Sequence, residues 1–270
     1  MLRDLGTTSI DLGRLRSGLA YTQRARGLSE RPGDARSAMV TRLTLGQVHA
    51  QLDDNEAALA HFAAALAAAR RLKDAANEAA ARLNAGVAER NLGRPAEARR
   101  HYRAAQSLAR RHGYKRIEAD ALIMGAELDL DARRWPQARE GFRLGAELAE
   151  SLGALSVRLN ANYGRGVVAL AQGEPEQAGK MFVALRSLAV ESGSRYGQLL
   201  ARLGEGQLAL TVDRPQAAQR SAREALALAQ ALEHREYHAA ARELLSDAMR
   251  VEPTAEVTKK APVRASRHTR

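Results

Sequence analysis

The sequence predicts an all-α fold, a right-handed α-solenoid of about six helix pairs with one closing helix at the C-terminal end. The main observation is an internal period of 40 residues, which keeps its register along nearly all of the 270 residues. A fixed period in this range is typical of an array whose units bury their apolar faces only against neighbouring units. The period is visible in two columns of small residues. The first holds Gly6, Gly46, Gly86, Ala126, Gly166, Gly206 and Ser246, and the second holds Gly18, Ala58, Ala98, Ala138, Ala178 and Ala218.

A second observation is an apolar stripe in each unit. All three Phe of the chain stand in one column, four residues after the second small column. Mostly Ala follows three residues later and mostly Leu three residues after that, and this spacing follows one face of an α-helix. Each unit therefore contains a helix that approaches its neighbour closely at the small residue, with an aromatic ring beside it. The aromatic column holds Phe62, Tyr102, Phe142 and Phe182.

Breaks rich in Gly and Pro divide each unit into two helices. Gly can end a helix in the left-handed conformation, and Pro is tolerated at the first position of the next helix. Pro95, Pro175 and Pro215 share one column, and Pro136 lies one residue later in its own unit. The predicted pairs are 39–52 with 55–72, 76–92 with 95–112, 115–132 with 135–152, 155–172 with 175–192, and 195–212 with 215–232.

The two ends of the chain are predicted separately. A weaker pair covers 2–12 and 15–30, and a closing helix covers 235–250, so the solenoid spans 1–252. Residues 253–270 combine basic side chains with almost no large apolar ones, and we expect a basic disordered tail. A closing helix needs a polar outer face. We expect Leu244, Leu245 and Ser246 to pack inward and Arg242, Glu243 and Asp247 to face water.

The pattern of a small residue, Ala twelve residues later, an aromatic four later and Ala three later resembles the tetratricopeptide repeat. The best unit reads Gly86, Ala98, Tyr102 and Ala105. The unit is longer than the common repeat of about 34 residues, and it is similar to the tetratricopeptide-like regions of bacterial transcription activators and response-regulator phosphatases. The resemblance covers about 1–250, although no Pro closes each unit and the usual Trp is absent. It implies a concave face, lined by the first helices, that holds partner segments.

Composition narrows the class of protein. Cys is absent, so no disulfide or thiolate metal site is available, and we expect a cytoplasmic protein. The longest apolar stretch, 57–69, is too short to span a membrane, and no apolar signal core is present near the start. The net charge is +11. Arg residues that offset helix dipoles explain much of it, and a surface that binds nucleic acid is the alternative.

No set of residues predicts catalysis. The chain has no glycine-rich phosphate loop and no serine elbow, so we expect no enzyme activity, no catalytic residue and no cofactor. His234 and His238 are four residues apart but lack the Glu of the zinc-protease motif, which favours a solvated helix face over a metal site. His61 and His101 share one repeat column, which favours surface positions. Trp135 is interpreted as a cover over a junction between units, with an exposed binding anchor as the alternative.

The groove implied by the resemblance is the better candidate for a binding site. Asn84 matches the groove Asn that family members use to hold a peptide backbone, and a helix–helix contact is its alternative. Arg90 is expected to form a cationic surface, with Glu127 and Asp131 forming an anionic surface about one repeat away. The predicted partner-binding residues are Asn84, Val87, Arg90, Asn91, Glu127, Asp131, Tyr163 and Gln207.

These observations predict a non-catalytic scaffold for protein–protein interaction. It would bind a protein or peptide segment in its concave groove, in a regulatory or signalling setting and without a membrane. The alternative is an Arg-rich solenoid that binds nucleic acid. Interleaved acidic residues and few aromatics make this the weaker hypothesis. The sequence leaves the identity of the partner and the oligomeric state open.

Overall fold

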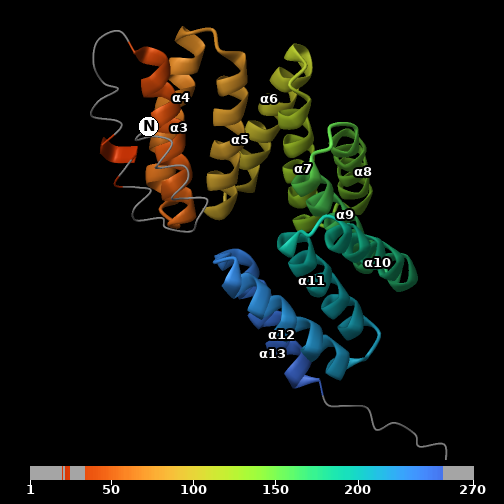
Figure 1. Ribbon diagram of the computed structural model, residues 1–270. Helices are drawn as coiled ribbons and strands as arrows, with labels where there is room; N and C mark the ends of the chain where they lie inside the picture. The colour runs from red at the N-terminus through yellow and green to blue at the C-terminus, as the bar shows by residue number, and fades with distance from the viewer. Residues whose placement is uncertain (1–19, 21, 25–33, 252–270) are drawn as a thin grey trace, which may run out of the picture.

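The computed structural model describes residues 20, 22–24 and 34–251, and this part consists of α-helices joined by short turns (Figure 1). None of these residues lies in a strand. Consecutive helices pack side by side and stack into one curved array. The helices are α3 (Ala35–Gln51), α4 (Asn55–Arg71), α5 (Ala75–Asn91), α6 (Pro95–His112), α7 (Lys115–Asp131), α8 (Trp135–Ser151), α9 (Leu155–Ala171), α10 (Pro175–Glu191), α11 (Arg195–Thr211), α12 (Pro215–Ala231) and α13 (Arg235–Arg250).

The predicted helix boundaries are confirmed to within one residue from α4 to α13. The exception is α3, which begins at Ala35 instead of at residue 39. Asp34 explains the earlier start, because its carboxylate accepts a hydrogen bond from the backbone N–H of Ser37 and caps the helix. The weaker pair predicted at the start of the chain lies outside the described residues, apart from 20 and 22–24, and so does the predicted tail.

The connections between these helices share one backbone geometry. A residue with positive φ occurs every 20 residues from 53 to 233, so each unit of 40 residues consists of two halves of equal length. Gly fills five of these positions, where the left-handed conformation costs it little. Pattern reading based on Gly and Pro found those turns. The other five turns were also placed by the period, but nothing in the sequence indicated the left-handed conformation of Asp53, Lys73, Arg133, Asp213 and Glu233.

Small residues bring the helices close together, as predicted. A Cβ atom at Gly86 would lie 2.5 Å from Cε1 of Tyr102, so the aromatic ring occupies the space of the missing side chain. Phe182 is enclosed on two sides, because a Cβ at either Gly166 or Gly204 would collide with its ring. The second small column is fully buried, at Ala58, Ala98, Ala138, Ala178 and Ala218.

Helix α13 closes the described array. Its Ala241 and Leu244 pack in one apolar cluster with Ala222 and Ala225 of α12. Leu244 also reaches the space beside Gly206 that an aromatic ring fills in other units. The predicted polar face is confirmed, because Arg242, Glu243 and Asp247 are exposed. The inward face is only partly as predicted: Leu244 is buried, whereas Leu245 and Ser246 are half-buried.

We expect Gly166→Ala to lower the free energy of unfolding by roughly 1–3 kcal/mol, because its methyl group would overlap the Phe182 ring. Gly125→Ala on α7 is the matched control, since no neighbouring atom lies within 4 Å of the position that a Cβ would take. Removing a helical Gly there should stabilise by up to about 1 kcal/mol. Urea unfolding of both variants measures the difference, and equal effects would contradict the close approach.

A second expectation concerns the left-handed turns. Arg133→Gly should raise the free energy of unfolding by about 0.5–1 kcal/mol, because a left-handed residue with a Cβ is strained by roughly 1–2 kcal/mol. Gly153→Ala, with φ of 61° and no atom within 4 Å of the added Cβ, tests the same strain in the opposite direction. Thermal melts should move in opposite directions. Two shifts of the same sign would rule out backbone strain as the cause.

Candidate functional site on the inner face

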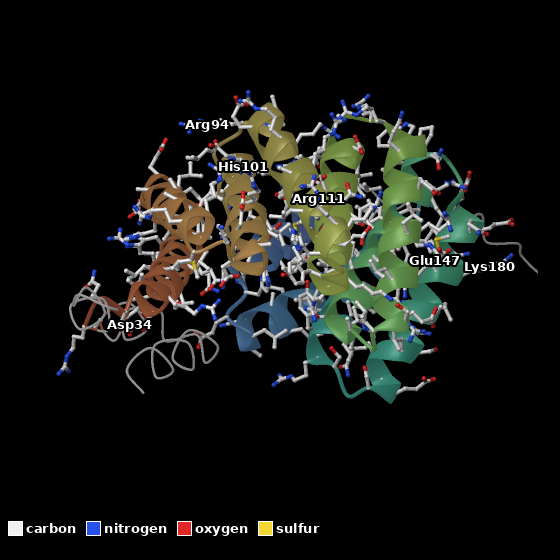
Figure 2. All side chains as sticks on the ribbon, turned by 90° about the horizontal axis from the view of Figure 1, so that it is seen from above. Asp34, Arg94, His101, Arg111, Glu147 and Lys180 are labelled. Atoms are coloured by element: carbon white, nitrogen blue, oxygen red, sulfur yellow. The ribbon has the colours of Figure 1, made fainter. Side chains whose placement is uncertain are left out.

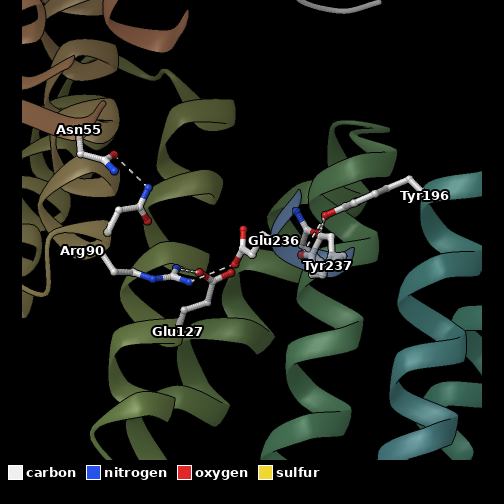
Figure 3. Close-up of polar contacts among 8 residues, drawn as sticks. Asn55, Arg90, Glu127, Tyr196, Glu236 and Tyr237 are labelled. Atoms are coloured by element: carbon white, nitrogen blue, oxygen red, sulfur yellow. Dashed lines mark hydrogen bonds and ion pairs between the residues drawn. The ribbon is translucent and has the colours of Figure 1, made fainter. Parts of the chain in front are cut away.

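The array curves until its last helix meets its second pair. Arg90 lies near the end of α5 and Glu236 in the first turn of α13, and their charged groups are only 3.7 Å apart. Figure 3 shows Glu236 and Tyr237 between Arg90 and Glu127 on one side and Tyr196 on the other. Helices far apart in the chain therefore surround one region on the inside of the curve. We call its polar side chains the inner cluster: Arg90, Glu127, Asn160, Tyr163, Tyr196, Gln207, Glu236 and Tyr237.

Arg90 connects two carboxylates from different helices. Its guanidinium donates a hydrogen bond to Glu127 of α7 in a close ion pair, and Glu236 approaches it from α13. Burial raises the pKa of Glu127, and the neighbouring Arg90 only partly offsets this. Burial alone would lower the pKa of Arg90, but its interactions with Glu127, Tyr102 and Glu236 together outweigh burial and the pKa is raised. With both carboxylates ionised, the two negative charges exceed the one positive charge.

The other half of the cluster is aromatic and neutral. The Tyr196 hydroxyl donates to Oδ1 of Asn160 at 2.6 Å and lies 3.2 Å from the hydroxyl of Tyr237. The His234 ring lies against both of these tyrosines, and the Tyr163 hydroxyl donates to Gln207 at 3.5 Å. Burial raises the pKa of Tyr163 and of Tyr196 to about 12. These hydroxyls therefore stay protonated near neutral pH and can both donate and accept hydrogen bonds.

The structure brings four of the predicted groove residues into the inner cluster. Arg90 pairs with Glu127, and Tyr163 pairs with Gln207. The other four have different surroundings. Asn91 donates to Asn55 at 3.2 Å, and Val87 packs against the apolar cluster that contains Tyr102. Asp131 is exposed, and Asn84 is half-buried without a side-chain hydrogen bond to a described residue.

Arg90 and Glu127 lie in neighbouring units, as expected. They do not stand as two adjacent surfaces of opposite charge, because α5 and α7 pack together and the two side chains form one ion pair. Sequence reasoning also missed Glu236, Tyr237, Tyr196 and Asn160. The repeat columns relate neighbouring units only, so they carry no signal for a contact between α5 and α13.

The remaining candidates from the sequence do not form a second polar cluster. His61 and His101 are half-buried, and the His61 ring stacks on His49 at 5.2 Å, so the expected surface positions are wrong. Trp135 is half-buried at the start of α8. Among the described residues, no group of three or more His, Asp or Glu could hold a metal ion. In the same part of the chain, no helix is long and apolar enough to cross a membrane.

Comparison with known proteins supports the fold. A family model for the tetratricopeptide repeat matches residues 34–111, which cover α3 to α6. The fold is that of a tetratricopeptide-type solenoid. No curated protein matches the chain by sequence.

Solved structures of low sequence identity share the fold over most of the chain. The apo form of RapI is 12% identical with a TM-score of 0.68, covering 92% of this chain and 96% of its own. A Rap protein complexed with Competence and Sporulation Factor is 12% identical with a TM-score of 0.71, covering 92% and 73%. The apo quorum sensor NprR from B. thuringiensis is 16% identical with a TM-score of 0.63, covering 92% and 75%.

The raised pKa of Glu127 makes stability depend on pH. The folded protein holds this proton more tightly than the unfolded chain, so the stabilisation is present below about pH 4.5 and is lost as pH rises through the raised pKa. As pH rises from about 4.5 through the raised pKa of Glu127, the free energy of unfolding of the native protein should fall relative to that of Glu127→Gln. Glu140 has its pKa lowered by its hydrogen bond with Arg143, so its stabilisation is present above about pH 4.5 and is lost as pH falls below that value. Urea unfolding from below to above pH 4.5 should therefore show the Glu140→Gln difference changing only on the acid side and the Glu127→Gln difference changing only above pH 4.5. Changes in the same pH window would contradict the assignment.

Proposed function

We propose that the chain is a non-catalytic scaffold that binds a peptide segment of a partner protein against the inner cluster. The observation that supports this most directly is the convergence of polar groups from α5, α7, α9, α11 and α13 on the inside of the curve. The Rap protein complexed with Competence and Sporulation Factor and the quorum sensor NprR have the same fold and favour a regulatory role.

The cluster favours a segment with a basic side chain. Glu127 and Glu236 together outweigh the single charge of Arg90, and the exposed Asp131 lies near enough to Glu127 to raise its pKa further. A cation from the partner would relieve this repulsion. Asn84 is the candidate for holding the peptide backbone, since its amide can donate to a carbonyl and accept from an N–H. The tyrosine hydroxyls offer further neutral hydrogen bonds.

Nucleic-acid binding is the weaker alternative. Many arginines on the outer surface have carboxylate partners, so acidic groups interrupt the positive charge that a continuous contact with a phosphate backbone needs. Arg70 pairs with Glu78 at 3.2 Å, and Arg110 pairs with Glu118 at 2.7 Å one repeat later. Figure 2 shows side chains of both signs around the outside, with Arg94, Glu147 and Lys180 extending away from the helices.

The test is selection of short random peptides displayed on phage, followed by affinity measurement on the selected peptides. We expect selection for Arg or Lys. Glu127→Gln should weaken the selected basic peptides by tenfold or more, about 1.4 kcal/mol, because it removes a facing carboxylate. Asn84→Ala should weaken basic and neutral peptides alike. Its melting temperature should stay nearly unchanged if Asn84 is not a structural contact.

Glu140→Gln is the matched control for this measurement. Glu140 also accepts hydrogen bonds from an arginine, Arg143, but it is exposed on the outer helix α8. The Glu140→Gln variant should bind the selected peptides as tightly as the native protein does. Equal affinity for Glu127→Gln and Glu140→Gln, with both variants folded, would exclude the inner cluster as the binding site.

A further inference from the structure

The exposed face of α13 forms a second, separate groove at the end of the array. Residues from the middle and end of α13 and one residue of α12 enclose an open volume of about 600 Å³. Met249 in this groove is 64% exposed, which is unusual for a large apolar side chain. The lining residues are Leu226 of α12 and His238, Arg242, Leu245, Ser246, Met249 and Arg250 of α13.

The repeat shows what covers the equivalent face elsewhere in the chain. One period earlier, on α11, the residues equivalent to Arg242, Ser246 and Met249 are Arg202, Gly206 and Ala209. All three contact α12: Arg202 pairs with Glu224 at 2.7 Å, a Cβ on Gly206 would lie 3.4 Å from Ser221, and Ala209 packs against Ala218. The groove on α13 is therefore the position that a second helix takes in the other described pairs.

The geometry points to this groove as a docking site for an amphipathic, acidic helix from a partner protein, which completes the pair that α13 begins. The second helices of the chain define the apolar pattern of such a helix. Each carries a buried Ala followed four residues later by a buried residue, which is Phe or Tyr in α4, α6, α8 and α10. In three of these pairs the ring lies against the Gly that is equivalent to Ser246, at Gly46, Gly86 and Gly166.

An ion pair one repeat earlier indicates where the docking helix needs a carboxylate. Arg202 binds Glu224, which stands two residues after Ala222 in the aromatic column. Arg242 is the equivalent of Arg202, is exposed, and has no ion-pair partner among the described residues. Among the described residues, the only ion pair of Arg250 is with Asp247, at 3.5 Å. A carboxylate two residues after the aromatic would therefore face Arg242.

Two other occupants fit this face less well. In the register of the repeat, Ala222 and Glu224 correspond to Pro262 and Arg264 of the chain's own sequence. Pro is disfavoured inside a helix, and an arginine there would repel Arg242. A second copy packed through the same face would bring the same positive charges together around a two-fold axis. An acidic helix has neither problem.

The test uses a labelled peptide with the α10 sequence, Pro175–Glu191, in which Ala184→Glu places a carboxylate two residues after Phe182. A second peptide carries Ala184→Lys instead. Fluorescence anisotropy with the full chain should show the Glu peptide binding at least tenfold tighter than the Lys peptide. Arg242→Glu should reverse that order, and Ser246→Phe, which fills the groove, should weaken both peptides. Arg223→Glu, an exposed change on α12 outside the groove, should alter neither affinity.

Four results would overturn the proposal. The first is equal binding of both peptides to the native chain and to Arg242→Glu, and the second is unchanged binding to Ser246→Phe. The third is peptide binding that appears only after residues 252–270 are removed, which would assign the groove to the chain itself. The fourth is a dimer in sedimentation that Ser246→Phe dissociates, which would assign it to a second copy. The outcome is independent of the inner cluster, because Glu127→Gln should leave binding of the Glu peptide unchanged.

Discussion

The structure depends on the close approach of helices at columns of small residues. Gly86 and Gly166 leave space for the rings of Tyr102 and Phe182, and a single added methyl group would overlap them. Few large apolar side chains are needed when Ala and Gly bring backbones this near, and aromatics make up only 4% of the chain. Dispersion between closely packed atoms then replaces the area that larger side chains would bury. Contacts of this kind recur in successive units along the array.

The inner cluster depends on the curvature of the array (Figure 1). The curve brings α13 close enough to α5 for Arg90 and Glu236 to meet, although no repeat relation links them. The cost of burying Glu127 is visible in its raised pKa, and the ion pair with Arg90 offsets only part of it. A half-buried carboxylate held at this cost by one guanidinium is poorly satisfied. A cationic side chain from a partner would give the Glu127 carboxylate a second ion pair. The cluster therefore fits a role in recognition better than a role in stabilising the fold.

The fold could be predicted from the sequence because its determinants are local and repeated. Helix limits followed from Pro95, Pro175 and Pro215 and from the glycines of the turns, while the aromatic column identified the buried face. The site could be predicted only in part. Arg90, Glu127, Tyr163 and Gln207 were found because first-helix positions are fixed within a unit. The contact of Arg90 with Glu236 could not be predicted, since it depends on curvature summed over several units and no single column encodes it. Left-handed residues such as Lys73 and Arg133 were missed because the architecture imposes their conformation against intrinsic preference.

Helix α13 links the two surfaces with opposite charge preferences. Its first turn supplies Glu236 and Tyr237 to the inner cluster, whereas Arg242 and Arg250 line the groove on α13. On the two proposals, the inner cluster would take a basic segment and the groove on α13 an acidic helix, so one ligand class would not suit both. Both surfaces rely on the same anchor, the packing of Ala241 and Leu244 against Ala222 and Ala225 of α12. Ala248 extends this packing to Ala218 near the start of α12, so the interface between α12 and α13 sets the geometry of both proposed surfaces.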